Sequence, residues 1–166
     1  MISNKQICQE CKECCYFYLE ESYFAPLITK EELAKIPKDK QAYFKPYKES
    51  NNTFQVQLIR CKKDNDYVCP MLDEETYLCE IYDSRPFDCK IWPFIIMKDK
   101  QGKTVLACSN KSNCRIIKNM PDKEFNSHFK KLLAMLKDKG LLEWLNKNKD
   151  LIWDYEDDTF IIKELT

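Results

Sequence analysis

The sequence predicts an α+β fold: a small, irregular, cysteine-rich, metal-centred domain with short hairpins, followed by a C-terminal helical segment. Three observations support this class. Ten cysteines lie between positions 8 and 114, short stretches of alternating polarity separate them, and helix-spaced apolar residues fill the last third. We expect a single domain over residues 1–166, with a cysteine-cluster core at 1–118 and a helical extension at 119–166.

The first cysteine cluster places four thiols within eight residues. They are Cys8, Cys11, Cys14 and Cys15. Two residues between cysteines form a turn that brings both sulfurs to one metal and lets backbone N–H groups point at the thiolates. The side chains of the adjacent Cys14 and Cys15 diverge, so this pair suits two metals or one multinuclear cluster better than one small tetrahedral site. The alternative for this stretch is a local group of disulfides or buried thiols.

The expected compartment decides between metal and disulfides. No apolar signal-peptide region follows Met1, and no run approaches the length of a membrane span, so we expect a cytoplasmic protein without membrane association. Disulfides rarely persist there, and ten cysteines then indicate metal. The single histidine, His128, lies in a helical pattern and is not expected to be a ligand. Thiolate ligands favour zinc or iron, with a 4Fe–4S cluster among the open alternatives, over magnesium or calcium.

The charge balance disfavours two classes of partner. Lys plus Arg and Asp plus Glu number 27 each, so the formal net charge is zero. The overall charge therefore does not suggest nucleic acid or an anionic membrane as a partner. The lysines of residues 111–149 alternate with acids, as on a solvated helix face. A metal ion is the expected partner, and the sequence names no protein partner.

Two hairpins are predicted in the middle of the chain. Residues 53–60 alternate with period two, which predicts a half-buried strand that pairs with residues 67–69 across a polar turn. Residues 94–97 and 104–107 predict a second hairpin, with Gly102 at its turn. The aromatic run at residues 16–19 is expected to pack over the metal region and exclude water.

Helices are predicted from caps and from apolar spacing. Thr29 and Glu32 form a capping-box pattern that predicts a short helix ending near Ile36. A helical turn is expected directly after Pro86. After residue 121, apolar spacing predicts a helix that ends with Gly140 at its C′ position. A second helix over 141–146 and a closing strand over 159–162 complete the prediction.

The remaining cysteines supply the rest of the predicted ligand set. Three of them lie ten residues apart on short Pro-bearing segments, and two more follow in an expected polar loop. The predicted ligands are Cys8, Cys11, Cys14, Cys15, Cys69, Cys79, Cys89 and one of Cys108 and Cys114. Eight thiolates fit two four-thiolate sites, or one cubane cluster plus one zinc. Cys61 and the remaining later cysteine, expected to be exposed, would be exchange ligands in a metallochaperone or sensor.

Three blocks of residues occur in a fixed order. They are Cys8-x2-Cys11-x2-Cys14-Cys15, then Cys69-Pro70-x-Leu72, then Cys79-x-Ile81-Tyr82-x2-Arg85-Pro86-x2-Cys89-Lys90-x2-Pro93. In this order the blocks, over residues 8–93, resemble the CxxCxxCC family of cysteine-cluster proteins, to which zinc or iron chelation is ascribed. Lys90 stands where the family usually has Arg, and Lys12-Glu13 where a Gly often follows the second cysteine. The resemblance implies metal binding through these cysteines, with Cys108 or Cys114 similar to the family's later cysteine.

These observations predict a cytosolic metal-binding protein that holds zinc or an iron–sulfur cluster through about eight Cys thiolates. The alternative is an enzyme that uses an iron–sulfur centre for redox chemistry or methyl-group transfer. The flagellin lysine-methylating enzymes, which are longer proteins, carry a cysteine cluster similar to this one. A catalytic centre needs an open coordination position, against which eight available thiols argue. No catalytic residue is assigned, and the sequence does not choose between zinc and iron.

Overall fold

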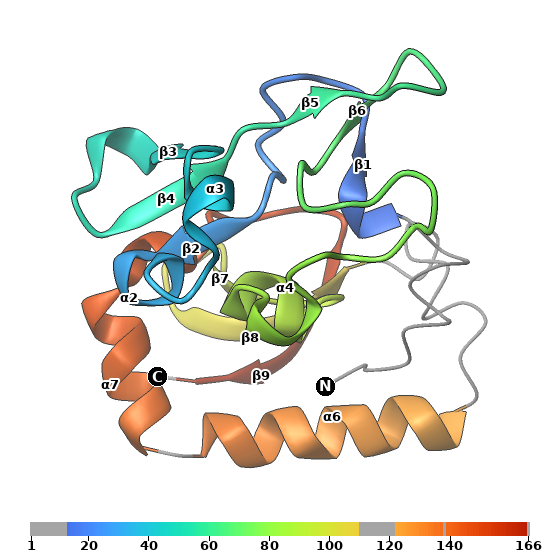
Figure 1. Cartoon of the computed structure of the whole chain (residues 1–166). Helices are drawn as coiled ribbons and strands as arrows, with labels where there is room; N and C mark the ends of the chain where they lie inside the picture. Colours follow the sequence, from blue (N-terminus) through green and yellow to red (C-terminus); the bar gives the residue numbers. More distant parts are fainter. Residues whose placement is uncertain (1–12, 110–121, 138, 166) are drawn as a thin grey trace. The chain divides into compact units, whose positions relative to one another are not determined.

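The computed structural model describes residues 13–109, 122–137 and 139–165. It contains both helices and small sheets, so the predicted α+β class is confirmed (Figure 1). Contacts within the chain divide it into two compact units, one holding the described residues up to Lys90 and the other those from Ile91 onward. The organisation as a single domain stays a prediction.

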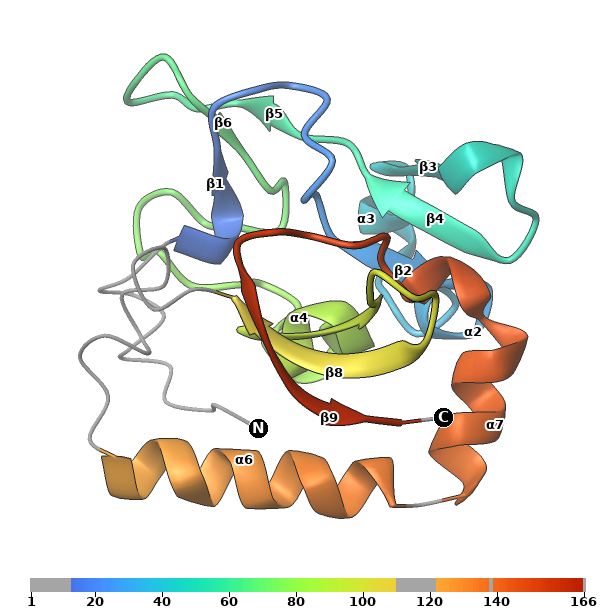
Figure 2. The same cartoon turned by 180° about the vertical axis from the view of Figure 1, so that it is seen from behind.

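The unit up to Lys90 is built from short elements. Its strands are β1 (Tyr16–Phe17), β2 (Leu27–Thr29), β3 (Phe44–Pro46), β4 (Thr53–Val56), β5 (Ile59–Arg60) and β6 (Tyr67–Val68). Its helices are α2 (Lys30–Leu33), α3 (Lys38–Gln41) and α4 (Phe87–Ile91). The last residue of α4, Ile91, belongs to the other unit. The strands form two antiparallel sheets, in the orders β1–β6–β5 and β2–β4–β3 (Figures 1 and 2). Helix α4 begins directly after Pro86, as predicted.

The predicted strand over residues 53–60 is two strands. β4 lies between β2 and β3, whereas β5 pairs with β6 in the other sheet. Between them the Gln57 N–H donates to the Tyr43 carbonyl at 2.7 Å, and the Leu58 side chain is buried. The chain therefore leaves one sheet and joins the next at this point. The predicted pairing with residues 67–68 is confirmed, with Ile59 opposite Val68, but the single continuous strand is wrong.

Helix α2 begins with the predicted capping box. The Thr29 hydroxyl accepts from the Glu32 N–H at 3.3 Å, and Glu32 Oε2 accepts from the Thr29 N–H at 3.1 Å. Thr29 is fully buried, so these bonds satisfy donors that water does not reach. The helix ends at Leu33 rather than near Ile36, because the N–H groups of Lys35 and Ile36 bond carbonyls three residues back in a tighter turn.

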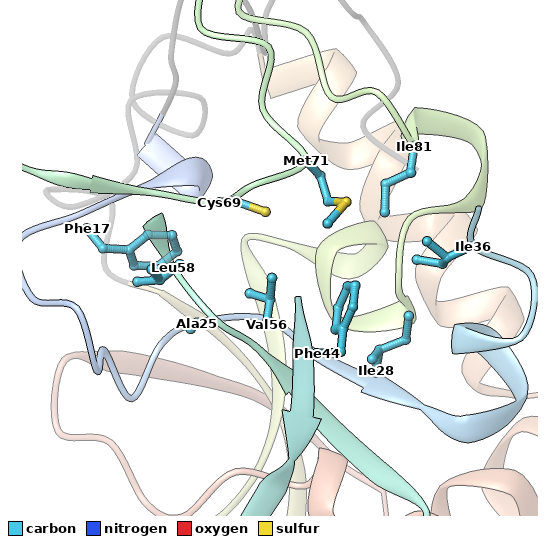
Figure 3. Close-up of a cluster of buried hydrophobic side chains, with 10 residues drawn as sticks. All are labelled: Phe17, Ala25, Ile28, Ile36, Phe44, Val56, Leu58, Cys69, Met71 and Ile81. Carbon is cyan, nitrogen blue, oxygen red and sulfur yellow. The ribbon is translucent and has the colours of Figure 1, made fainter. Parts of the chain in front are cut away.

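A hydrophobic core joins the two sheets of this unit. Its buried members are Phe17, Ala25, Ile28, Ile36, Phe44, Val56, Leu58, Cys69, Met71 and Ile81. Figure 3 shows these side chains, with the sulfur-bearing Cys69 and Met71 near each other on one side of the cluster. Cys15 and Cys79 pack against the same cluster. Cysteine side chains from separate segments are thus part of this core.

The second unit is a three-stranded sheet with two helices. Its elements are β7 (Phe94–Lys98), β8 (Thr104–Ser109), α6 (Asp122–Leu136), α7 (Lys139–Lys147) and β9 (Thr159–Glu164), with the strand order β7–β8–β9. The predicted hairpin is confirmed, and Gly102 has a φ of +80° at its turn, a conformation that favours glycine. The predicted closing strand is also confirmed. Gly140 is not the C′ residue of α6, because it lies inside α7.

Aromatic and aliphatic contacts hold this second unit together. The Phe129 ring of α6 stacks on the Phe94 ring of β7, with centroids 5.8 Å apart, and Leu132 and Leu136 are buried. Trp153 packs with the apolar side chains of β7 and β8, and its backbone bonds Ile96 and Lys98. Within the described ranges, the helices are too short or too polar to cross a membrane.

Candidate metal centre

A backbone ladder brings the end of the N-terminal cysteine cluster to Cys69. Cys14 and Cys15 form the end of a 3-10 turn that leads directly into β1. β1 pairs with β6, with Tyr16 opposite Val68, and the Cys69 N–H donates to the Cys15 carbonyl at 3.0 Å. The register therefore places Cys15, directly before β1, beside Cys69, directly after β6, although 54 positions separate them in sequence (69 − 15).

The loop after β6 connects Cys69 to Cys79. An isolated bridge pairs Leu72 with Cys79, and the Glu80 N–H donates to the Met71 carbonyl at 2.8 Å. Burial raises the pKa of the Cys69 thiol to about 12, and the charge of Cys79 adds to the rise. The Met71 N–H bonds Cys69 Sγ and opposes that rise. A backbone N–H two residues after a cysteine, directed at its sulfur, is what the thiolate of a metal ligand needs.

Cys89 lies on α4, and two acidic side chains fix this helix to β2 and α2. Glu32 Oε1 accepts from the Phe87 N–H at 2.8 Å, and Asp88 Oδ2 accepts from the Leu27 N–H at 3.1 Å. Sequence reasoning assigned Glu32 only to the capping box and missed both anchoring roles. The partners lie 55 and 61 residues away, so no local pattern could indicate them.

Three thiols from these segments lie within electrostatic reach of Cys89. Burial raises the pKa of Cys89 well above its usual value, and the charges of Asp88, Cys69, Cys15 and Cys79 raise it further. Cys69 is buried and the other three thiols are half-buried. Four such thiolates without a counter-charge would repel one another, whereas a bound cation stabilises the deprotonated form. The donor set therefore suits a thiophilic metal such as zinc or iron better than an oxygen-seeking one.

The described residues contain only part of the predicted ligand set. Among residues 13–109, 122–137 and 139–165, no three His, Cys, Asp or Glu side chains are arranged so that they could hold a metal ion. Three of the predicted ligands, Cys8, Cys11 and Cys114, lie outside these ranges. The structure thus brings Cys15, Cys69, Cys79 and Cys89 into one region, with Cys14 adjacent to Cys15, and leaves the complete set a prediction.

Cys61 is buried, which corrects its expected exposure. Only 5% of the residue is exposed, and its Sγ donates to Glu74 Oε2 at 3.3 Å. The Lys63 N–H donates to the same sulfur at 3.4 Å. Burial raises the pKa of Cys61, with further contributions from hydrogen bonds to Asp64 and Glu74. Burial and the neighbouring Cys61 together raise the pKa of Tyr16 to about 12. Because this thiol is enclosed and hydrogen-bonded, it is not the accessible exchange ligand that the cysteine count suggested.

Cys108 does not lie in a polar loop. It is a buried residue of β8, opposite Phe94 of β7 and Phe160 of β9. The prediction failed because the β8 strand continues to Ser109, two residues beyond the expected apolar stretch.

The aromatic run at residues 16–19 is also only partly as expected. Phe17 is buried, but Tyr18 and Leu19 are 87% and 69% exposed, so they cannot exclude water from a buried site.

The fold and the thiol arrangement define a small α+β protein with a cysteine cluster assembled from distant segments. The chain belongs to the CxxCxxCC family, whose model is described as "Putative zinc- or iron-chelating domain" and matches residues 7–131. This match confirms the resemblance drawn from the three cysteine blocks. No significant match was found among curated proteins or among solved structures.

Proposed function

We propose that this protein binds zinc or an iron–sulfur cluster through Cys8, Cys11, Cys14, Cys15, Cys69, Cys79, Cys89 and either Cys108 or Cys114. The observation that supports the proposal is that Cys69, with Cys15 and Cys79 packed against it, belongs to one core, and that the charges of all three act on Cys89. Their segments are held there by the β1–β6 pairing, the Leu72–Cys79 bridge and the two anchors of α4.

The spacing at the N-terminus supports the rest of the ligand set. Cys8 and Cys11 precede Cys14 at C-x2-C intervals, and Cys14 and Cys15 lead directly into β1. A metal shared between this segment and Cys69, Cys79 and Cys89 would fix the N-terminal part of the chain to residues 69–89. Such a role is energetically substantial, since structural zinc contributes about 10–16 kcal/mol at neutral pH. That is comparable with the whole stability of a domain, about 5–15 kcal/mol.

Anaerobic purification followed by metal analysis and a visible spectrum tests this function. A brown protein with iron and acid-labile sulfide would identify an iron–sulfur cluster. A colourless protein with stoichiometric zinc would identify zinc sites. A protein that retains neither metal, with its cysteines paired as disulfides by mass spectrometry, would overturn the proposal.

A further inference from the structure

A surface cluster of apolar side chains occupies the loop between β1 and β2, which we call the aromatic loop (residues 18–24, the blue segment between these strands in Figure 1). Tyr18 is 87% exposed, Leu19 69% and Phe24 54%, and Tyr23 is also exposed. Single exposed apolar residues are ordinary, but four within seven positions are a patch. Such patches on soluble proteins mark interaction sites.

The backbone of the aromatic loop is held in place beneath these side chains. The Gln55 side-chain amide donates to the carbonyls of Tyr23 at 3.2 Å and Ala25 at 2.9 Å. The Ala25 N–H closes a turn onto the Ser22 carbonyl at 3.0 Å, and Ala25 is buried. The rings of Tyr23 and Phe24 meet edge to face, with centroids 5.6 Å apart. A partner would therefore meet a preorganised surface at Tyr23 and Phe24, which lowers the entropy cost of binding.

The charge of this part of the chain indicates what kind of partner fits. Residues 16–29 contain no Lys, Arg or His, although the chain has 27 Lys and Arg residues. Two exposed carboxylates, Glu20 and Glu21, lie inside the aromatic loop. Carboxylates attract cations directly, and exposed aromatic faces attract them through the negative charge of the ring face. The glutamates and the exposed aromatic rings of the loop therefore both favour a positively charged ligand.

We propose that the aromatic loop is a docking surface for a segment of a partner protein that presents Lys or Arg side chains beside apolar ones. The Lys or Arg side chains would lie on the rings of Tyr18 and Phe24 and beside the two glutamates. The apolar side chains would cover Leu19. A loop of this size supports a weak, transient complex, at the low end of interface areas. This inference does not rest on the metal.

Fluorescence anisotropy with the full-length protein tests the proposal. The probes are two labelled peptides of equal length, one of alternating Lys and Leu and the other of alternating Glu and Leu. The Lys peptide should bind more tightly than the Glu peptide, and salt should weaken its binding. The double substitution Tyr18→Ser/Phe24→Ser should lower its affinity up to about tenfold, since two contacts of this kind are lost. Glu20→Gln/Glu21→Gln should lower both the affinity and the salt dependence.

The chain offers a matched control on β9, where Phe160 and Ile161 are 55% and 53% exposed. The double substitution Phe160→Ser/Ile161→Ser should leave binding of the Lys peptide within about twofold of wild type, because it removes similar apolar area elsewhere. Equal binding of both peptides, or an equal loss in this control, would overturn the proposal. So would a wild-type dimer that Tyr18→Ser/Phe24→Ser abolishes while no peptide binds, since the occupant would then be a second copy.

Discussion

The Cys61 thiol donates a buried hydrogen bond to Glu74, with Sγ and Oε2 3.3 Å apart. The same carboxylate oxygen accepts from the Lys62 N–H at 2.8 Å, and only 6% of Glu74 is exposed. The bond joins the turn after β5 to the loop after Cys69. Cys61 is thus occupied as a neutral hydrogen-bond donor to Glu74, whereas a metal ligand is a deprotonated thiolate.

Replacement of Glu74 should therefore destabilise the fold. Glu74→Ala leaves the buried Cys61 thiol and the part-buried Lys62 N–H without their acceptor, and we expect the free energy of unfolding to fall by about 1–3 kcal/mol in urea denaturation. The neighbouring Glu75 is a matched control, because its side chain is 83% exposed and its nearest ion pair, with Lys63, spans 3.8 Å. Glu75→Ala should change stability by less than about 0.5 kcal/mol. Equal effects of the two substitutions would contradict the role assigned to Glu74.

Glu32 has a second testable role beside helix capping. It bonds both the Thr29 N–H and the Phe87 N–H, so it connects α2 with the helix that carries Cys89. Glu32→Ala should cost about 2 kcal/mol, the sum of a lost cap and a lost hydrogen bond to a charged group.

The adjacent Glu31 is exposed and serves as the control for Glu32. Glu31→Ala should cost less than about 0.5 kcal/mol. The two variants are compared by urea denaturation of protein purified under identical anaerobic conditions. A Glu32→Ala variant as stable as Glu31→Ala would show that the bond to Phe87 contributes nothing.

Local patterns predicted those elements whose determinants are close in sequence. The capping box of α2 needs only Thr29 and Glu32, and the β7–β8 hairpin needs a turn at Gly102 between two apolar runs. The break between β4 and β5 depends on the bond from Gln57 to Tyr43, which alternation of side chains does not reveal. Gly140 was expected to end helix α6, but α6 ends earlier, at Leu136. Gly140 lies instead in the first turn of α7, where a glycine is tolerated.

The candidate site shows the same division. Cysteine spacing indicated which residues could be ligands. It could not reveal the β1–β6 register or the anchors of α4, because both join residues far apart in sequence. Counting cysteines left Cys61 as a surplus and therefore as a presumed exposed thiol. Its burial follows from a carboxylate 13 positions away, which no cysteine motif includes.

Metal removal should loosen the unit up to Lys90 more than the other unit. Hydrogen exchange can report this through the Cys69 amide, which bonds the Cys15 carbonyl, and the Lys90 amide, which bonds Pro86. Both amides should lose protection when a chelator removes the metal, because the free energy of metal binding contributes directly to the stability of the fold at such sites. The Trp153 amide, bonded to Ile96, is the internal reference. Unchanged protection at Cys69 and Lys90 would contradict a structural role for the metal.

The acidic segment before β9 should make stability depend on pH. Burial raises the pKa of Glu156, and repulsion from Asp154 and Asp157 adds to the rise. Between the ordinary pKa of a glutamate and this raised value, the folded state binds more protons than the unfolded state. The free energy of unfolding therefore falls as pH rises through that window. Glu156→Gln should be more stable than wild type at pH 7, with the difference gone near about pH 4.

Urea midpoints at the two pH values provide the measurement for Glu156. Glu143→Gln, on the exposed face of α7, changes the net charge by the same amount and controls for that change. A difference between Glu156→Gln and wild type that is as large at pH 4 as at pH 7 would exclude titration of Glu156 as its cause.

Metal content per chain, measured side by side in two cysteine variants, tests the central claim most directly. Cys89 lies among the grouped thiols and Cys61 is bonded to Glu74, so one is a proposed ligand and the other is not. After anaerobic purification, Cys89→Ser should lose metal relative to wild type, whereas Cys61→Ser should keep the wild-type content and spectrum. A Cys89→Ser protein with full wild-type metal content would contradict the proposed centre.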